Sequence, residues 1–278
     1  MNLRTASRIF FAVTMIAIAV MPVFGGTFAP IWQPVPATVP LRHLLAFLCL
    51  VVPLAAGLGL LMKRRGAEPP ALLLFLYLAA WAIAFKAPVI VRHPLVEVAY
   101  QSCGENAVQI AGAWILYIWL ANETGAARIG FLTGDRALRL ARLLCGLAYI
   151  AFGFSHFAYL NLTAPLVPKW LPGPVFWAYL TGTVYLVSGV TLVTSFAARL
   201  GALLAAVQIT LITLLVWGPY VLAGHISADN WQETVVSWAI TAGAWVVAAS
   251  FGASPWFGLA IYSRPKTAPP TAPSRRHR

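Results

Sequence analysis

Charged residues are scarce in this chain. Only 9% of its 278 residues are Asp, Glu, Lys or Arg, while 60% are hydrophobic. Soluble chains carry about 25% charged and about 45–50% apolar residues, and a water-soluble fold cannot cover its surface with so few charges. The composition therefore excludes an ordinary soluble domain and favours a protein surrounded by lipid.

Acidic residues and cysteines are also few. The chain has seven Asp and Glu, and its three cysteines, Cys49, Cys103 and Cys145, form neither a CxxC motif nor a metal-binding spacing. We expect the cysteines to pack as small apolar side chains. The sequence lacks a P-loop, a GxGxxG motif after a strand, a GxSxG motif, a CxxCH haem motif and an HExxH zinc motif. No motif therefore identifies a catalysed reaction, and we predict no metal site.

Long apolar runs fill most of the chain. A spanning helix needs about 20 mostly apolar residues, because the hydrocarbon core is about 30 Å thick and every backbone amide must be satisfied within the segment. Eight such segments occur, at residues 9–24, 44–62, 71–91, 107–121, 138–160, 175–196, 200–223 and 235–259. The sequence therefore predicts an all-α membrane protein of eight transmembrane helices.

The basic residues lie at the ends of these segments, which argues against a nucleic-acid partner and bears instead on orientation. With a cytoplasmic N-terminus, fifteen of the 19 Lys and Arg residues fall on the inner side. The outer side holds Arg42, Lys86, Arg92 and Lys169. This bias places both termini in the cytoplasm of a multi-pass protein of the cell (inner) membrane. We expect Lys86 to reach the outer interface by extending its side chain.

The two halves of the chain match each other at a nearly constant offset. The matching pairs are Phe24-Gly25 with Phe152-Gly153, Gly57 with Gly189, Pro88 with Pro219, and Gly112-Ala113-Trp114 with Gly243-Ala244-Trp245. Residues 1–126 and 127–262 are therefore predicted to form two tandem, parallel four-helix repeats. The prolines are expected to end their helices. Residues 263–278, rich in proline and basic side chains, are predicted to be a disordered cytoplasmic tail.

The second half resembles the DoxX-like family of small bacterial membrane proteins between Tyr149 and Tyr220. The stretches that carry the resemblance are Phe152-Gly153-Phe154-Ser155-His156-Phe157, Val167-Pro168-Lys169-Trp170-Leu171-Pro172-Gly173, Phe176-Trp177-Ala178-Tyr179-Leu180-Thr181-Gly182, Leu186-Val187-Ser188-Gly189 and Arg199-Leu200-Gly201-Ala202. The resemblance implies a four-helix unit and an association with redox membrane systems, since relatives include small subunits of quinone-linked enzymes. The first half lacks the tryptophan-containing loop and has Phe28 where the second half has His156, so we expect it to serve as a degenerate scaffold.

The strongest candidate for a ligand-binding residue is His156, which lies beside Ser155 and close to the Trp170 loop. An imidazole carries protons near neutral pH, but the preferred reading of His156 is a structural hydrogen bond to a loop carbonyl. Gln208 lies near the middle of an apolar segment, where a polar group faces either a neighbouring helix or a lipid-soluble ligand such as a quinone.

Further polar residues are predicted at the outer ends of the helices. They include the histidines His43, His93, His156 and His225 and the acids Glu97, Glu105, Asp229 and Glu233. These groups either converge on ligand sites in the mouths of the bundles or are simply solvated. Glu105 and Glu233 are also expected to precede the last helix of each repeat, where a carboxylate complements the helix dipole.

Two functional hypotheses follow from the sequence. The first is a quinone-interacting accessory subunit of a membrane redox system, with a redox partner protein and with quinone as its cofactor. The second is a non-enzymatic membrane scaffold or small-molecule carrier. The resemblance alone ranks the first above the second.

Overall fold

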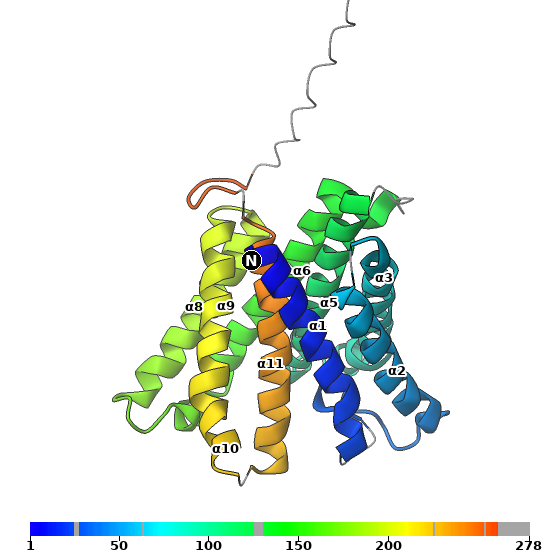
Figure 1. The fold of residues 1–278 in the computed structure, drawn as a ribbon. Coiled ribbons are helices and arrows are strands. Elements are labelled where there is room, and N and C mark those ends of the chain that lie inside the picture. The colour runs from blue at the N-terminus through cyan, green and yellow to red at the C-terminus, as the bar shows by residue number, and fades with distance from the viewer. Residues whose placement is uncertain (25–27, 63, 125–129, 225, 253, 261–278) are drawn as a thin grey trace, which may run out of the picture.

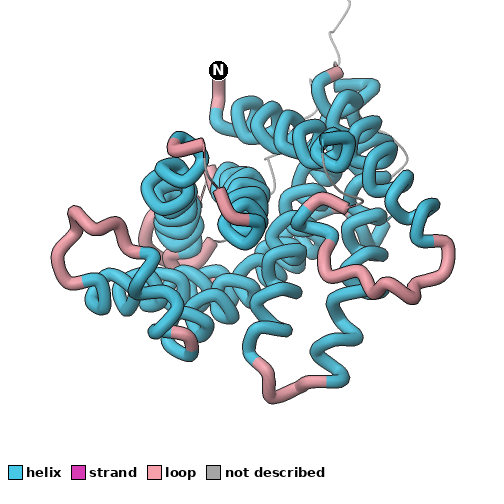
Figure 2. Tube along the Cα trace, turned by 90° about the horizontal axis from the view of Figure 1, so that it is seen from below, coloured by secondary structure: helices cyan, strands magenta, loops and turns pink. Residues whose placement is uncertain are grey.

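The chain is a bundle of long helices in a computed structural model (Figure 1). The structure describes all residues except 25–27, 63, 125–129, 225, 253 and 261–278. Figure 2 shows the described chain as helices joined by loops, and its one β pairing is an isolated bridge between Phe196 and Leu259. The predicted tail from residue 263 lies outside the described residues. The all-α prediction is confirmed for the part that the structure describes.

The helices follow the same order in both halves. The first half contains α1 (Leu3–Val20), η1 (Met21–Phe24), η2 (Pro30–Trp32), α2 (Arg42–Leu61), α3 (Arg64–Trp81), η3 (Ala82–Lys86), α4 (Ala87–Arg92) and α5 (Glu97–Thr124). After η4 (Gly130–Leu132), the second half contains α6 (Gly134–Ala158), α7 (Leu160–Thr163), η5 (Ala164–Leu166), α8 (Pro174–Thr194), α9 (Ala198–Ile212), η6 (Thr213–Trp217), α10 (Gly218–Leu222) and α11 (Ala228–Ala249). Helices thus occupy all eight apolar segments.

Six of the helical segments have the length and composition to cross a membrane. They are Leu3–Val23, Arg42–Leu61, Gly66–Arg92, Gly134–Ala158, Pro174–Thr194 and Ala198–Leu222. In each, only 33% to 50% of the most apolar window is buried inside the protein, so the rest forms an apolar outer surface. A lipid-facing surface of this kind is typical of a multi-pass membrane protein.

The other two long helices, α5 and α11, form the centre of the bundle and pack against each other. More than half of each is buried: 17 of the 28 residues of α5 and 13 of the 22 residues of α11. Most of their side chains therefore face protein. They can therefore include polar residues such as Asn106 and Gln109, which lower their hydropathy.

Small residues set the spacing of the outer helices against one another. A Cβ atom added to Gly57 of α2 would lie 2.8 Å from the carbonyl oxygen of Ala12 on α1. In the second half, a Cβ atom on Gly189 of α8 would lie 2.7 Å from the carbonyl oxygen of Gly146 on α6. Each glycine thus allows two helix backbones to touch, which is how helices associate in lipid without a hydrophobic driving force.

The predictions for Pro88 and Pro219 were wrong, because neither residue ends its helix. A π-helical turn precedes each proline, at Ala82–Lys86 and at Thr213–Trp217, and the helix continues to Arg92 or Leu222. Proline lacks an amide hydrogen and crowds the preceding turn, and a wider turn absorbs both effects.

Two further predictions are corrected by the structure. Lys86 does not extend to the interface: only 3% of its surface is exposed, because its ammonium group donates hydrogen bonds to the Gln33 carbonyl and the Ser102 hydroxyl. The last apolar segment ends as a helix at Ala249 rather than at residue 259. The Ala197 amide instead donates a hydrogen bond to the Gly258 carbonyl, and the Ala260 amide donates one to the Ser195 carbonyl. The segment after α11 therefore lies across the turn between α8 and α9.

Candidate functional site

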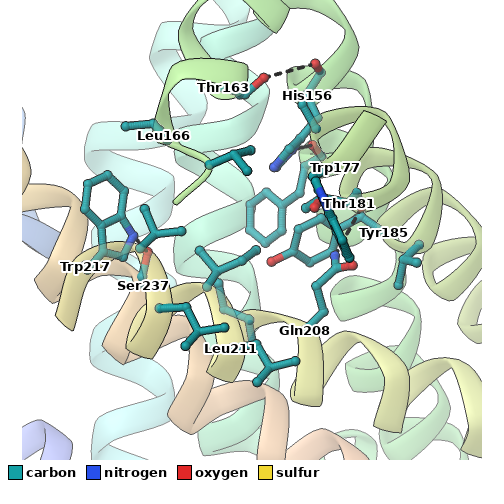
Figure 3. A pocket seen from close by; sticks show the side chains of 18 of the residues that line it. His156, Thr163, Leu166, Trp177, Thr181, Tyr185, Gln208, Leu211, Trp217 and Ser237 are labelled. Atoms are coloured by element: carbon teal, nitrogen blue, oxygen red, sulfur yellow. Dashed lines mark hydrogen bonds between the residues drawn. The ribbon is translucent and has the colours of Figure 1, made fainter. Parts of the chain in front are cut away.

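A cavity of about 440 Å³ lies in the second half, where α8 and α9 separate (Figure 3). It is lined by residues near the end of α6 and the start of α8. These helix ends lie at the end of the bundle opposite the N-terminus (Figure 1). The walls of the cavity come from α6, α8, α9, η6 and α11, from the segment at residues 163–171, and from α5 of the first half. The cavity is therefore completed by both halves of the chain.

The cavity exists because α8 and α9 touch at one end and diverge at the other. A Cβ atom on Gly201 of α9 would lie 3.2 Å from the Cα of Ser188 on α8, so the two helices are in contact there. Farther along, the amide of Gln208 donates a 3.1 Å hydrogen bond to the Thr181 carbonyl. Beyond this bond the helices separate, and the space between them opens.

Most of the wall is apolar, and part of it faces the outer surface. Leu180 on α8 is 39% exposed, and Val207 and Leu211 on α9 are 44% and 49% exposed, although all three line the cavity. Side chains that line a cavity and are also exposed mark its opening. The opening lies between two helices whose length and composition suit a membrane span.

Polar groups gather on the inner side of the cavity. His156 projects from the last turn of α6, and its Nδ1 lies 2.8 Å from the Phe152 carbonyl. A carbonyl only accepts, so Nδ1 carries the proton and Nε2 of the neutral ring is an acceptor. The hydroxyl of Ser155 donates to the side-chain oxygen of Gln101 on α5. Figure 3 shows the Tyr185 hydroxyl close to Gln208.

Two carboxylates complete the polar side. Glu105 reaches the cavity from α5 and Glu233 from α11. Both residues lie inside their helices, so the prediction that they precede the last helix of each repeat was wrong. The cap of α11 is Ser227, whose hydroxyl oxygen accepts a 3.2 Å hydrogen bond from the Asn230 amide. Glu233 is therefore free to face the cavity.

Four of the six predicted site residues meet in this cavity. Ser155, His156, Gln208 and Glu233 all line it. Trp170 does not line it and is 68% exposed, because its loop contributes Leu171 to the wall instead. His225 lies outside the described residues.

Gln101, Tyr185 and Trp177 line the cavity but were not among the predicted site residues, and Glu105 was predicted either to join a ligand site or to be solvated. Trp177 belongs to the stretch that resembles the DoxX-like family, so the resemblance was a usable signal for it. Gln101 had no such signal, because it belongs to the first half and reaches the cavity only through the packing of α5 against α6.

Large aromatic side chains occupy the equivalent place in the first half. In the alignment of the two halves that pairs Gly112 with Gly243, Tyr77 and Trp81 correspond to Gln208 and Ile212. Tyr77 and Trp81 contact Trp32, which is fully buried, with ring centroids 5.4 Å and 5.2 Å away. The Tyr77 hydroxyl donates to the Cys49 sulfur at 3.1 Å, where the second half has the bond from Gln208 to Thr181. In this alignment, aromatic rings therefore pack together at positions that correspond to part of the cavity wall in the second half.

No group of three or more His, Cys, Asp or Glu side chains in the described residues has the arrangement of a metal site.

Comparison of the chain with family models, with curated proteins and with solved structures finds no match.

Proposed function

We propose that this chain is a membrane protein of eight spanning helices, in two tandem repeats, that binds a lipid-soluble small molecule of the quinone class. The observation that carries the proposal is the cavity between α8 and α9, which is mostly apolar, opens between two helices suited to a membrane span and has polar groups on its inner side. Binding sites of this kind have volumes of about 300–1,000 Å³ and a few convergent polar groups.

The count of eight spans is supported by the length and position of α5 and α11. At about 1.5 Å per residue, 28 and 22 residues extend about 42 Å and 33 Å, which is enough to cross a hydrocarbon core of about 30 Å. Both helices run through the centre of the bundle beside the six apolar segments. Their lower hydropathy follows from burial against protein.

The duplication is supported by the shared helix order. In the alignment that pairs Gly112 with Gly243, the two π-helical turns, Ala82–Lys86 and Thr213–Trp217, begin at equivalent positions, and so do α5 and α11. The first helix of each half packs against the last helix of the other, α1 against α11 and α6 against α5. Packing of the first helix of each half against the last helix of the other is expected for two halves related by a twofold axis along the membrane normal.

The orientation with both termini in the cytoplasm is supported by the position of the basic residues. The chain begins at the same end of the bundle at which α11 ends (Figure 1). Arg142 and Arg199 bond there to Ser250 and Ser254. Cations gathered at one end favour the cytoplasmic side of an inner membrane.

The association with a redox system comes from the resemblance to DoxX-like proteins, which implies a partner that reduces or oxidises the bound quinone. The scaffold or carrier role is favoured by the first half, where aromatic rings pack together at positions that correspond to part of the cavity wall. Under this second reading, a ligand is held or passed on without a redox partner.

A cavity-filling variant tests the binding site directly. Protein purified in mild detergent is extracted with solvent for bound quinone and titrated with a short-chain quinone and its reduced form, and quenching of tryptophan fluorescence gives Kd. Val207→Trp, which fills the cavity, is expected to weaken binding at least 10-fold. Val190→Trp is the matched control, because Val190 lies on the exposed face of α8 and does not line the cavity. Equal binding by both variants and the natural chain would refute the site.

A further inference from the structure

The hydrogen-bonding groups of the cavity are unevenly divided between acceptors and donors. The acceptors that can carry a negative charge are the carboxyl groups of Glu105 and Glu233, and the Nε2 atom of His156 adds a neutral acceptor. Neither lysine nor arginine occurs among the described residues that line the cavity. A ligand with a negative head group would therefore meet like charges and find no cation.

The donors of the cavity are mostly occupied by the protein itself. The indole nitrogens of Trp177 and Trp217 donate to the Pro172 carbonyl and the Ser237 hydroxyl, each at 3.0 Å. The Ser155 hydroxyl donates to Gln101, and the Gln208 amide donates to the Thr181 carbonyl. These bonds hold the walls in place and leave fewer donors for a ligand.

Neutral groups with spare hydrogens do remain, and they bond to ligands of either type. The hydroxyls of Tyr185 and Thr181 and the amide of Gln101 both donate and accept. Such groups add to affinity for an oxidised or a reduced head group alike. The charged acceptors therefore decide which form is preferred.

Lys86 gives the carboxylates of Glu105 and Glu233 different electrostatic surroundings. It lies behind the cavity wall in the π-helical turn of the first half, and its ammonium group interacts electrostatically with Glu105. The charged group that acts on Glu233 is Asp229, which has the same sign. Glu233 is an exposed residue, and it lines the cavity. It is thus the carboxylate whose charge is least compensated and most accessible.

We infer that the cavity selects a ligand whose head group donates hydrogen bonds and carries no negative charge, with Glu233 as the acceptor. Within the quinone class this is the reduced, dihydroxy form, since its hydroxyls donate whereas the carbonyls of the oxidised form only accept. The inference rests on the proposed function and concerns binding alone, with no electron transferred. Hydrogen bonds to charged groups are stronger than those between neutral groups.

Titration of one short-chain quinone in its two redox states tests this selectivity. The full-length natural chain in detergent is titrated with the dihydroxy form under anaerobic conditions and with the oxidised form, and both Kd values are compared. The dihydroxy form is expected to bind about 10-fold more tightly, the size of one hydrogen bond to a charged group. A saturated fatty acid of similar length is expected to compete poorly.

Replacement of Glu233 assigns the preference to a residue. Glu233→Gln is expected to weaken binding of the dihydroxy form about 10-fold and to change binding of the oxidised form less than threefold. Asp135→Asn is the control, since Asp135 is exposed in the first turn of α6, far along the helix from His156. Elution as a single peak in size-exclusion chromatography verifies that each variant is folded.

Each failure has its own meaning. If neither form binds the natural chain, the proposed function is wrong. If both forms bind equally well, or the oxidised form binds more tightly, the selectivity is wrong while the binding site stands. If Glu233→Gln keeps the full preference, the role of Glu233 is wrong. The comparison of the two redox forms uses the natural chain, so it holds even if a variant fails to fold.

Discussion

Gly112 of α5 and Gly243 of α11 lie against each other at the centre of the bundle. A Cβ atom added to Gly112 would be 3.2 Å from the Cα of Gly243, and one added to Gly243 would be 2.8 Å from the Val108 carbonyl oxygen. The same two glycines correspond to each other in the two halves of the sequence, within the matching Gly-Ala-Trp stretches. Contact between equivalent residues is expected on a twofold axis, so we place the axis of the proposed duplication at this point.

Substitution of the central glycine should destabilise the bundle. Gly243→Val must push α5 and α11 apart, and we expect a loss of about 1–3 kcal/mol in the free energy of unfolding, typical of overpacked sites. Thermal unfolding in detergent, followed by circular dichroism, measures the effect. Gly130→Ala is the control because a Cβ there has no neighbour within 4 Å, and its effect should be small. Equal melting temperatures for the two variants would contradict the central contact.

Removal of the buried ammonium group should cost stability in a way that depends on Glu105. Lys86→Met leaves the Gln33 carbonyl and the Ser102 hydroxyl without their donor and Glu105 without its cation. We expect about 1–3 kcal/mol of destabilisation. The double variant Lys86→Met with Glu105→Gln should recover part of this loss, since interacting residues are not additive.

The matched measurement for Lys86 is urea or heat unfolding of the two single variants and the double variant in one detergent. Strictly additive effects would show that Lys86 and Glu105 are independent. An unchanged stability of Lys86→Met would show that the side chain reaches water, as the sequence alone predicted.

A smaller side chain in the aromatic cluster of the first half, formed by Trp32, Tyr77, Trp81 and Phe85, should destabilise the protein. Trp81→Ile introduces the residue that stands at the corresponding position of the second half, and it removes ring contacts with Trp32, Tyr77 and Phe85. We expect a loss of about 2–4 kcal/mol, in the range for large core truncations. The reference variant Ile212→Val in the second half should cost about 1 kcal/mol. Melting temperatures in detergent distinguish the two. Equal effects would mean that the cluster contributes no special packing.

Labelling of single cysteines tests the topology. Ala228→Cys at the start of α11 and Asp135→Cys at the start of α6 place thiols at opposite ends of the bundle. In intact cells, a membrane-impermeant maleimide should label Ala228→Cys and leave Asp135→Cys unlabelled until the cells are lysed. The natural chain gives the background from its own cysteines, of which Cys49 and Cys145 are buried. The reverse pattern would invert the proposed orientation.

Much of the fold was predictable because the signal for it is local. A run of apolar residues has to be a helix in lipid wherever it occurs, so the eight segments coincide with helices whose ends differ by a few residues in most cases. The error at the last segment is of the same origin: residues 250–259 are apolar enough to continue the helix. The chain turns back after Ala249 instead, and hydrogen bonds to the α8–α9 turn replace the helical ones.

The candidate site was predictable only in part. His156 and Ser155 are adjacent in sequence within the stretch that resembles the DoxX-like family, and Gln208 stood out as a polar group within an apolar helix, so signals along the chain singled them out. Their common cavity depends on the divergence of α8 from α9, which begins at the contact between Gly201 and Ser188. No pattern along the chain indicates that Glu105 of the first half faces the same space.

The sequence by itself determined that this chain forms long helices suited to lipid, and it indicated two matching halves with basic residues predicted on one side. These properties follow from side-chain hydropathy and from the need to satisfy every backbone amide within a segment. The tertiary structure alone decided that Lys86 is buried, that Trp170 lies outside the cavity, and that aromatic rings pack together in the first half at positions that line the cavity in the second. Such outcomes depend on which helix faces meet, and that depends on packing between residues far apart in the chain.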